Sequence, residues 1–108
     1  MLPKSRRLNL KKDFKWLVTG QKFDTKYAAV YIRFAKNQLP MFAVAAPSRN
    51  FKKAVDRNRV KRVFYQAFQD LQDLPKSINI FALPKPACLG VKSEDILLDL
   101  KQCLLNLL

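Results

Sequence analysis

The sequence predicts one small domain in which helices pack on a β-sheet. The chain has 108 residues, enough for a single domain (1–108) and too few for two. Two segments, residues 53–71 and the stretch from residue 93 to the C-terminus, repeat apolar side chains at helical spacing. Three others, residues 27–35, 39–46 and 78–83, have the length and apolar pattern of strands.

The first expected element is a short helix over residues 10–19. Asn9 is a suitable N-cap, and Gly20 suits the position just after a helix end. The strand of residues 27–35 has two different faces. The core face is apolar and is formed by Ala28, Val30, Ile32 and Phe34. The other face is aromatic and basic and is formed by Tyr27, Ala29, Tyr31 and Arg33.

A turn at Asn37-Gln38 should connect this strand to the next one, which ends before Pro47. The long helix should end at Leu74-Pro75. Its apolar side, expected to face the sheet, is formed by Val60, Val63, Phe64, Ala67, Phe68 and Leu71. Ser93 is the expected cap of the last helix, whose apolar side is formed by Ile96, Leu100, Cys103, Leu104 and Leu107.

The charge of the chain points to a polyanionic partner. There are 21 Lys and Arg against 8 Asp and Glu, a formal net charge of +13. Such self-repulsion destabilises a compact domain unless a polyanion neutralises it, and nucleic acid is the usual one. An anionic membrane is the rival, but no terminus reads as a basic amphipathic helix, so we expect no membrane partner. Nothing resembles a secretory signal, and the two cysteines lack a C-x-x-C spacing, so free thiols in the cytoplasm are expected.

The segment Arg57–Arg62 is the most informative. On a helix, Arg59 and Arg62 point away from the apolar face, and Arg57 and Lys61 lie nearer its edge. Cations near a helix N-terminus oppose the macrodipole, so the cluster works against local stability. A solvated basic face is the plain alternative, and phosphate binding is the interpretation we favour.

The aromatic face of the first long strand suggests a second contact. Aromatic rings stack on unpaired bases while nearby cations hold the backbone, as Tyr31 and Arg33 could do. Ordinary core packing is the alternative, and for Phe14 on the preceding helix the two are evenly balanced. No catalytic residue is expected, because the chain has no histidine, no Gly-rich phosphate loop and no carboxylate pair with metal-ligand spacing.

These residues together resemble a known family. Residues 48–62, followed by Gln66-Ala67-Phe68, look like the signature of the bacterial ribonuclease P protein, and the pattern Ala-Val-x-Arg-Asn-Arg-x-Lys-Arg at residues 54–62 is its specific part. The flanking segments fit in the same order. They are Arg7-Leu8, Asp13-Phe14, Gly20 and Lys85-Pro86-Ala87.

The resemblance implies an α+β fold, an α/β sandwich in the order α-β-β-β-α-β-α. It includes a short first strand at residues 21–24, a small mixed sheet packed by helices, and a left-handed β-α-β crossover. It also implies a protein subunit, one per RNA, that binds the ribonuclease P RNA and the 5′ leader of precursor tRNA. The RNA would carry out the hydrolysis with Mg2+ that it holds itself.

The resemblance also assigns residues to the two RNAs. The set expected at the catalytic RNA is Arg57, Asn58, Arg59, Lys61, Arg62, Lys53 and Arg49. The set expected in the leader cleft is Phe14, Tyr31, Arg33, Tyr27, Arg7 and Lys11. The chain departs from the family pattern at Asn50, Lys52, Tyr65 and Leu83, and Leu17 or Val18 replaces a second cleft aromatic.

Two other functions compete with this one. A structural RNA-binding protein of the ribosomal kind would bind ribosomal RNA without stimulating tRNA processing. A stand-alone nuclease would cleave precursor tRNA without any RNA subunit, and the missing metal and acid–base groups disfavour it.

Overall fold

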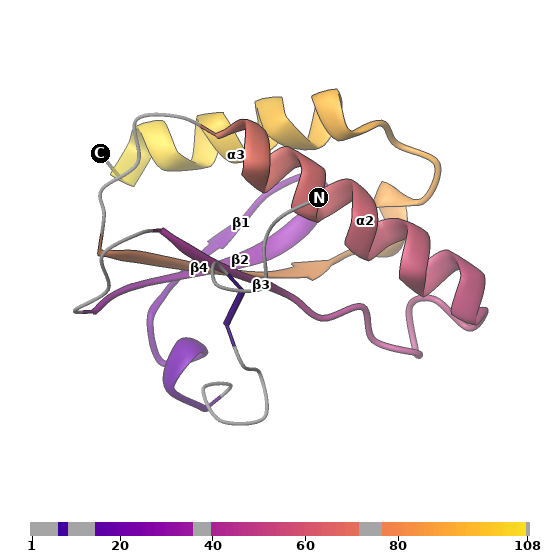
Figure 1. The fold of residues 1–108 in the computed structure, drawn as a ribbon, viewed down its shortest axis with the longest axis horizontal. Helices are drawn as coiled ribbons and strands as arrows, with labels where there is room; N and C mark the ends of the chain where they lie inside the picture. The colour runs from indigo at the N-terminus through magenta and orange to yellow at the C-terminus, as the bar shows by residue number, and fades with distance from the viewer. Residues whose placement is uncertain (1–6, 9–14, 36–39, 72–76, 108) are drawn as a thin grey trace.

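The structure is a computed structural model that describes residues 7–8, 15–35, 40–71 and 77–107. A four-stranded sheet forms its centre (Figure 1). The helices α2 (Ala54–Asp70) and α3 (Ser93–Leu107) lie on one side of this sheet. A helical turn at Lys15–Leu17 lies on the other side. The α+β sandwich is therefore confirmed.

The strands are β1 (Gln21–Asp24), β2 (Ala28–Phe34), β3 (Met41–Val44) and β4 (Ile78–Pro84), in the spatial order β1-β2-β4-β3. The pairs β1–β2 and β2–β4 are antiparallel, whereas β3–β4 is parallel. Parallel neighbours need a crossover connection, and α2 lies in the one between β3 and β4. The mixed sheet and the short first strand agree with the expected architecture.

The last strand in the chain lies in the middle of the sheet. Six of the seven residues of β4 are buried, because β4 has strands on both edges and side chains on both faces. The apolar run at residues 78–83 is the sequence signature of this position.

The larger core lies between the sheet and the two long helices. Helix α2 buries Val60, Phe64, Ala67 and Phe68 against it, as the helical spacing predicts. Phe68 stacks on Phe42 of β3, with ring centroids 4.7 Å apart. Helix α3 buries Ile96, Leu100, Cys103 and Leu104.

A smaller core lies on the opposite face of the sheet. Its buried members are Leu17, Ala43 and Phe81, with Trp16 and Tyr31 partly buried against them. The helical turn at Lys15–Leu17 therefore closes this face with an apolar contact. Of the predicted helix over residues 10–19, residues 10–14 lie outside the described part, and residues 18–19 form a turn.

Two expectations about local structure were wrong in detail. Phe34 was expected in the core, but it ends β2 and is 49% exposed. Gly20 was expected to adopt the left-handed conformation after a helix, but among the described glycines only Gly90 has a positive φ. A Cβ at Gly20 would lie 2.6 Å from the carbonyl oxygen of Ile32, so a close approach to β2 accounts for this glycine.

The other boundaries differ by one or a few residues. Helix α2 ends with the amide of Leu71 donating to the carbonyl of Phe68, and α3 includes Ser93 as its first residue rather than its cap. The predicted turn at Asn37-Gln38 and the helix stop at Leu74-Pro75 lie outside the described residues. No helix in the described ranges has the length and apolar character needed to span a bilayer.

Candidate nucleic-acid interface

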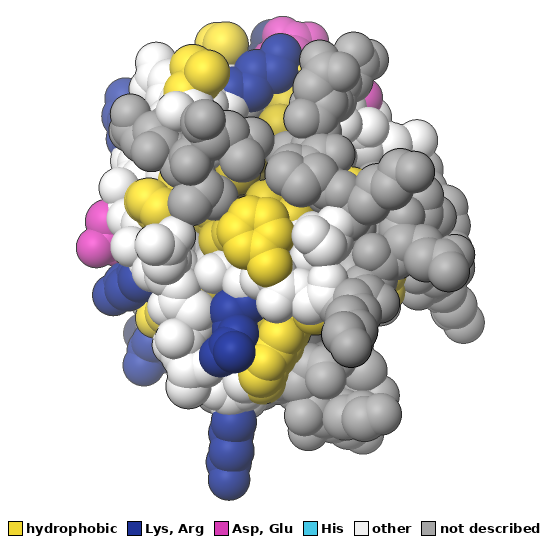
Figure 2. All heavy atoms as spheres, turned by 90° about the vertical axis from the view of Figure 1, so that its left-hand side faces the viewer, with side chains coloured by type: hydrophobic (Ala, Val, Ile, Leu, Met, Phe, Trp, Pro, Cys, Tyr) yellow, Lys and Arg dark blue, Asp and Glu magenta, His cyan; other side chains and the backbone are white. Residues whose placement is uncertain are grey.

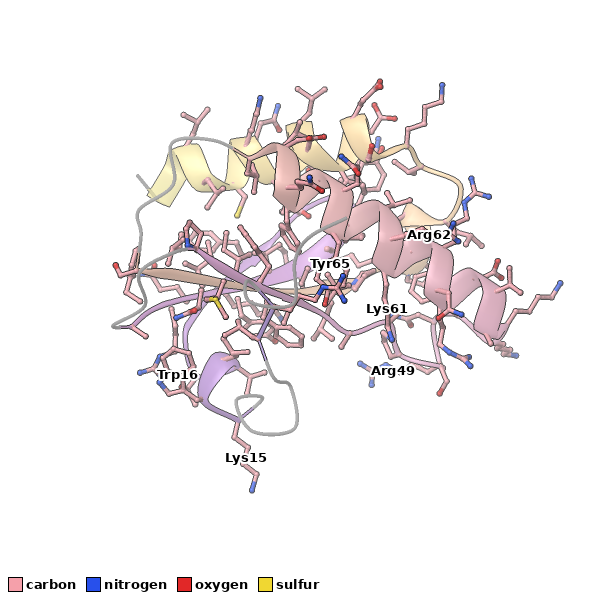
Figure 3. The ribbon with its side chains drawn as sticks, viewed as in Figure 1. Lys15, Trp16, Arg49, Lys61, Arg62 and Tyr65 are labelled. Atoms are coloured by element: carbon pink, nitrogen blue, oxygen red, sulfur yellow. The ribbon has the colours of Figure 1, made fainter. Side chains whose placement is uncertain are left out.

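The outward side of α2 is basic, as the sequence predicts. Arg59 and Arg62 are exposed, and Lys61 is half-buried nearer the apolar face. In Figure 3 the Lys61 side chain extends from α2 toward Arg49, on the side away from Arg62. Asn58 and Lys53 are also exposed, so of the set expected at the catalytic RNA only Arg57 and Lys61 are half-buried.

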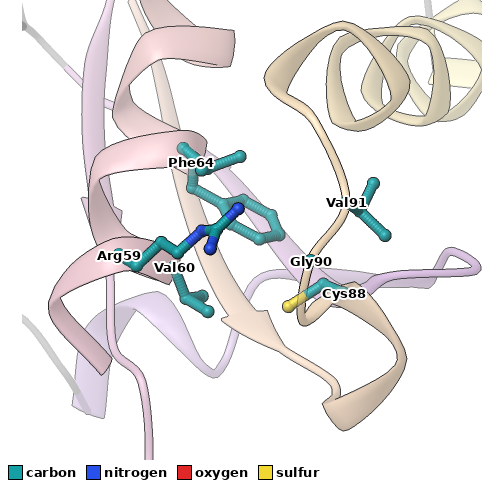
Figure 4. A pocket seen from close by; sticks show the side chains of 7 residues that line it. Arg59, Val60, Phe64, Cys88, Gly90 and Val91 are labelled. Atoms are coloured by element: carbon teal, nitrogen blue, oxygen red, sulfur yellow. The ribbon is translucent and has the colours of Figure 1, made fainter. Parts of the chain in front are cut away.

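A groove runs beside this basic surface, between α2 and the start of α3. It is lined by Arg59, Arg62, Val63, Gln66 and Ser93. A smaller apolar pocket adjoins it, and Arg59 extends from α2 toward the loop at Gly90 and Val91 that forms its far wall (Figure 4). Among the residues that the structure describes, none forms an ion pair or hydrogen bond with the side chain of Arg59 or Arg62, so both guanidinium groups can bind an external anion.

Cys88, which lines the smaller pocket, and Cys103 on α3 are buried free thiols. Burial raises the pKa of Cys88 from 9.0 to about 11, with a backbone hydrogen bond acting in the opposite direction. Burial also raises the pKa of Cys103, and the nearby Asp99 carboxylate adds to that effect. Neither thiol is therefore a ready nucleophile in the folded protein.

We expect both thiols to resist alkylation by iodoacetamide at about pH 8 in the native protein and to react quickly in denaturant. The folded pKa lies above the unfolded one, so the contribution of Cys88 to stability is complete below about pH 9 and is lost as the pH rises toward 11. Mass spectrometry of timed samples counts the modified thiols. Equal rates in native and denatured protein would contradict the burial of these side chains.

Arg57, one of the residues expected at the catalytic RNA, forms hydrogen bonds within the protein. Its Nη1 donates hydrogen bonds to the carbonyl oxygens of Phe51 at 2.9 Å and Lys52 at 3.0 Å. The sequence placed Arg57 near the edge of the apolar face, and the structure agrees, since the side chain is half-buried. The expected phosphate contact thus competes with two internal hydrogen bonds.

The second candidate surface is the sheet face that carries the smaller core. Tyr31 stacks on Phe81 of β4 with ring centroids 5.9 Å apart, and the Lys22 ammonium lies 5.9 Å from the centre of the Tyr31 ring. Lys22 is the cross-strand partner of Tyr31. In the lower half of Figure 2, apolar side chains (yellow) and basic side chains (dark blue) lie next to one another. Tyr31 is thus both a packing residue and part of an aromatic and basic surface.

Arg33 and Trp16 form a pair beside Tyr31 that the sequence analysis did not foresee. The Arg33 guanidinium lies 4.7 Å from the centre of the Trp16 ring and donates to the Trp16 carbonyl and the Thr19 hydroxyl. Arg33 therefore ties the first helix to β2. Trp16 is half-buried. It is the only tryptophan in the chain, and this was the one feature of the sequence that could have marked it as a candidate site residue.

Two residues expected in the leader cleft lie elsewhere. Tyr27 was placed on the same strand face as Tyr31, but it precedes β2 in a bend, and its ring packs against the larger core on the other side of the sheet. Its amide donates to Asp99 of α3 at 3.2 Å. The strand alternation does not extend to Tyr27, because the chain has not yet entered the sheet.

Arg7 is the second of these residues. It forms a parallel bridge with Phe42 of β3, and its guanidinium lies 4.9 Å from the centre of the Tyr65 ring on α2. Arg7 therefore lies with the basic surface of α2 rather than with Tyr31. Tyr65, one of the departures from the family pattern, supplies the ring on which it stacks. Phe14 and Lys11 lie outside the described residues.

Comparisons with known proteins agree on one family. The family model described as Ribonuclease P matches residues 2–108. A protein from Nitrosococcus oceani named "Ribonuclease P protein component" is 29% identical over 86 residues, which is 79% of this chain and 72% of the relative. The matched range of the family model includes the basic segment of α2 and all four strands.

Solved structures share the fold. The ribonuclease P protein of Thermotoga maritima superposes with a TM-score of 0.78 at 21% identity, covering 90% of this chain and 93% of the other. That of Staphylococcus aureus has a TM-score of 0.78 at 18% identity, covering 94% of each chain. The arrangement of one mixed sheet with two helices on one face is therefore common to these proteins.

Proposed function

Since this chain belongs to the ribonuclease P protein family, we propose that it is the protein subunit of a ribonuclease P and assists removal of the 5′ leader from precursor tRNA. The family match over residues 2–108 carries the proposal. The net charge of +13 supports an RNA partner, because cations that neutralise phosphates release counterions.

The two candidate surfaces correspond to two RNAs. The basic surface of α2, with Arg59 and Arg62 exposed, contacts the phosphates of the ribonuclease P RNA. The face with Tyr31, Lys22 and Trp16 contacts the single-stranded leader, whose bases can stack on aromatic rings. One protein binds one RNA, and the complex acts in the cytoplasm.

The chemistry belongs to the RNA subunit, which holds the Mg2+ ions. Within the described ranges, no three carboxylates or thiols gather as metal ligands would. Several carboxylates instead have structural partners. Asp24 pairs with Lys85 at 3.5 Å, and Asp99 accepts the amide of Tyr27. The protein's part is to hold two RNAs in one geometry, which lowers the entropic cost of bringing them together.

Reconstitution tests this proposal. We expect rigorously RNA-free protein to leave precursor tRNA intact, and the protein to restore site-specific cleavage by a ribonuclease P RNA at a magnesium concentration where the RNA alone is slow. Cleavage by the protein alone would support a stand-alone nuclease. Binding to ribosomal RNA without any stimulation would support the structural alternative.

The basic surface of α2 gives a more local prediction. Replacing Arg59 with alanine should lower the slope of log affinity against log salt by about one, because one phosphate contact is lost. Lys101→Ala removes the same charge from an exposed position on α3 and is the matched control. Titrations of the ribonuclease P RNA at several salt concentrations measure both slopes, and an unchanged slope for Arg59→Ala would mean that this face is only solvated.

A further inference from the structure

The loop that precedes α2 carries three exposed cations and is held by hydrogen bonds to α2 and to the end of β4. It runs from Pro47 to Lys53, with Arg49, Lys52 and Lys53 exposed. Arg57 donates hydrogen bonds to three consecutive carbonyls of this loop. Its side chain donates to Phe51 and Lys52, and its backbone amide donates to Lys53 at 3.2 Å.

The other end of the loop is also held. The amides of Asn50 and Phe51 both donate to the Pro47 carbonyl at 3.1 Å, and the Phe51 side chain is buried in the larger core. The side-chain amide of Asn50 donates to the Pro84 carbonyl at the end of β4, 3.2 Å away. The loop is therefore attached to the end of β4 at its middle residue and to α2 through its last three residues.

The position of Arg57 has a local cost that these bonds offset. A cation in the first turn of a helix is repelled by the positive end of the macrodipole, and the cap Lys53 makes no side-chain cap hydrogen bond. The Arg57 guanidinium offsets this repulsion by donating to the carbonyls of the two residues that precede the cap. Both hydrogen bonds come from one nitrogen, Nη1, so a side chain of similar length without a donor, such as methionine, would remove both of them at once.

We infer that Arg57 is a positioning residue for the RNA interface of the proposed function. It orders the loop of residues 47–53 so that Arg49, Lys52 and Lys53 reach the RNA together. The ordering is complete before binding, so those three side chains bind phosphates without the entropic cost of fixing their backbone at that moment. Arg59 and Arg62, by contrast, act directly through their exposed guanidinium groups.

A double-mutant cycle on the full chain separates positioning from direct contact. One partner is Arg57→Ala, and the other is a neutral-loop variant with Arg49→Ala, Lys52→Ala and Lys53→Ala combined. Arg62→Ala replaces Arg57→Ala in the control cycle, because it removes the same charge from an exposed position on the same helix. The dissociation constant for the ribonuclease P RNA is measured at one salt concentration for every variant.

We expect the neutral loop to weaken binding by the same factor, within about twofold, in the native and Arg62→Ala backgrounds. In the Arg57→Ala background that factor should shrink by about threefold or more, because the loop cations are no longer held in place. Equal factors in the two arginine backgrounds would show that Arg57 contacts phosphate independently. A neutral loop that binds as tightly as the native chain would also overturn the inference.

A second measurement needs no RNA and therefore remains informative if the proposed function fails. Amide hydrogen exchange at Asn50 and Phe51 should accelerate in Arg57→Ala and stay at the native rate in Arg62→Ala, while exchange in β4 stays slow in both. If Arg57→Ala does not fold, Arg57→Met keeps an extended side chain and loses both hydrogen bonds to the loop. Native loop exchange together with native RNA affinity in Arg57→Met would overturn the inference.

Discussion

Replacing Phe68 with alanine is expected to lower the free energy of unfolding by about 3–5 kcal/mol, a large part of the stability of a domain this size. Phe68 has no exposed surface and stacks on Phe42, while the rings of Phe64 and Tyr65 lie 6.4 Å away. The truncation removes this contact between α2 and β3 and leaves a cavity that the sheet cannot collapse to fill. Denaturant unfolding measures the loss.

Gln69→Ala is the control, because Gln69 is the next residue on α2 and is exposed. It should change the free energy of unfolding by no more than about 0.5 kcal/mol. The binding free energy of folded Phe68→Ala for RNA should change much less than its free energy of unfolding, because the basic side chains of α2 point away from the core. A Phe68→Ala protein as stable as the native chain would mean that the contact with Phe42 does not hold α2 to the sheet.

Tyr31→Leu is expected to weaken binding of precursor tRNA with a 5′ leader by about 1–3 kcal/mol and to leave binding of mature tRNA nearly unchanged. A base can stack on the tyrosine ring but not on leucine. Leucine still covers Phe81 with apolar surface, so it separates stacking from packing better than alanine does. Affinities are measured on the reconstituted complex, beside a melting curve of the free protein.

Tyr31→Phe is the matched control, because it keeps the ring and removes only the hydroxyl. It should retain most of the preference for leader-bearing tRNA. Tyr31→Ala should lose that preference and some thermal stability as well, since Tyr31 is packed on Phe81. Equal losses on leader-bearing and leader-free tRNA, together with a lowered melting temperature, would make Tyr31 a packing residue only.

Periodicity was enough to find most of the elements. Helix α2 differs from its predicted range by one residue at each end. Most of its predicted core positions are buried, because a helix on a sheet buries one continuous stripe, but Val63 is only half-buried and lines the groove beside α3. Strand alternation was reliable within β2 and wrong at both borders. Phe34 and Tyr27 both fit the alternating sequence pattern. Phe34, however, is the last residue of β2, and Tyr27 lies in the bend before β2 begins.

Side-chain partners were much harder to predict than exposure. The prediction that Arg59 and Arg62 face outward is correct, because helical spacing determines the side of the helix from which each side chain projects. The internal hydrogen bonds of Arg57 and Arg33 could not be predicted, since both side chains donate to backbone carbonyls, which no residue pattern marks. The Trp16–Arg33 pair depends on the packing of the first helix against β2, which is a tertiary contact.

The place of β4 in the sheet also determines when the molecule can fold. Val30 pairs with Ala82, and Phe42 pairs with Ile80, so each ladder joins residues far apart in the chain. The entropy of closing such long loops must be lost before any of these pairs forms, which slows folding relative to a helical protein of equal length. During synthesis, β2 and β3 are made before β4, the strand that pairs with both, exists. An unfinished chain therefore exposes open strand edges and the apolar side of α2 until residue 84 has been added.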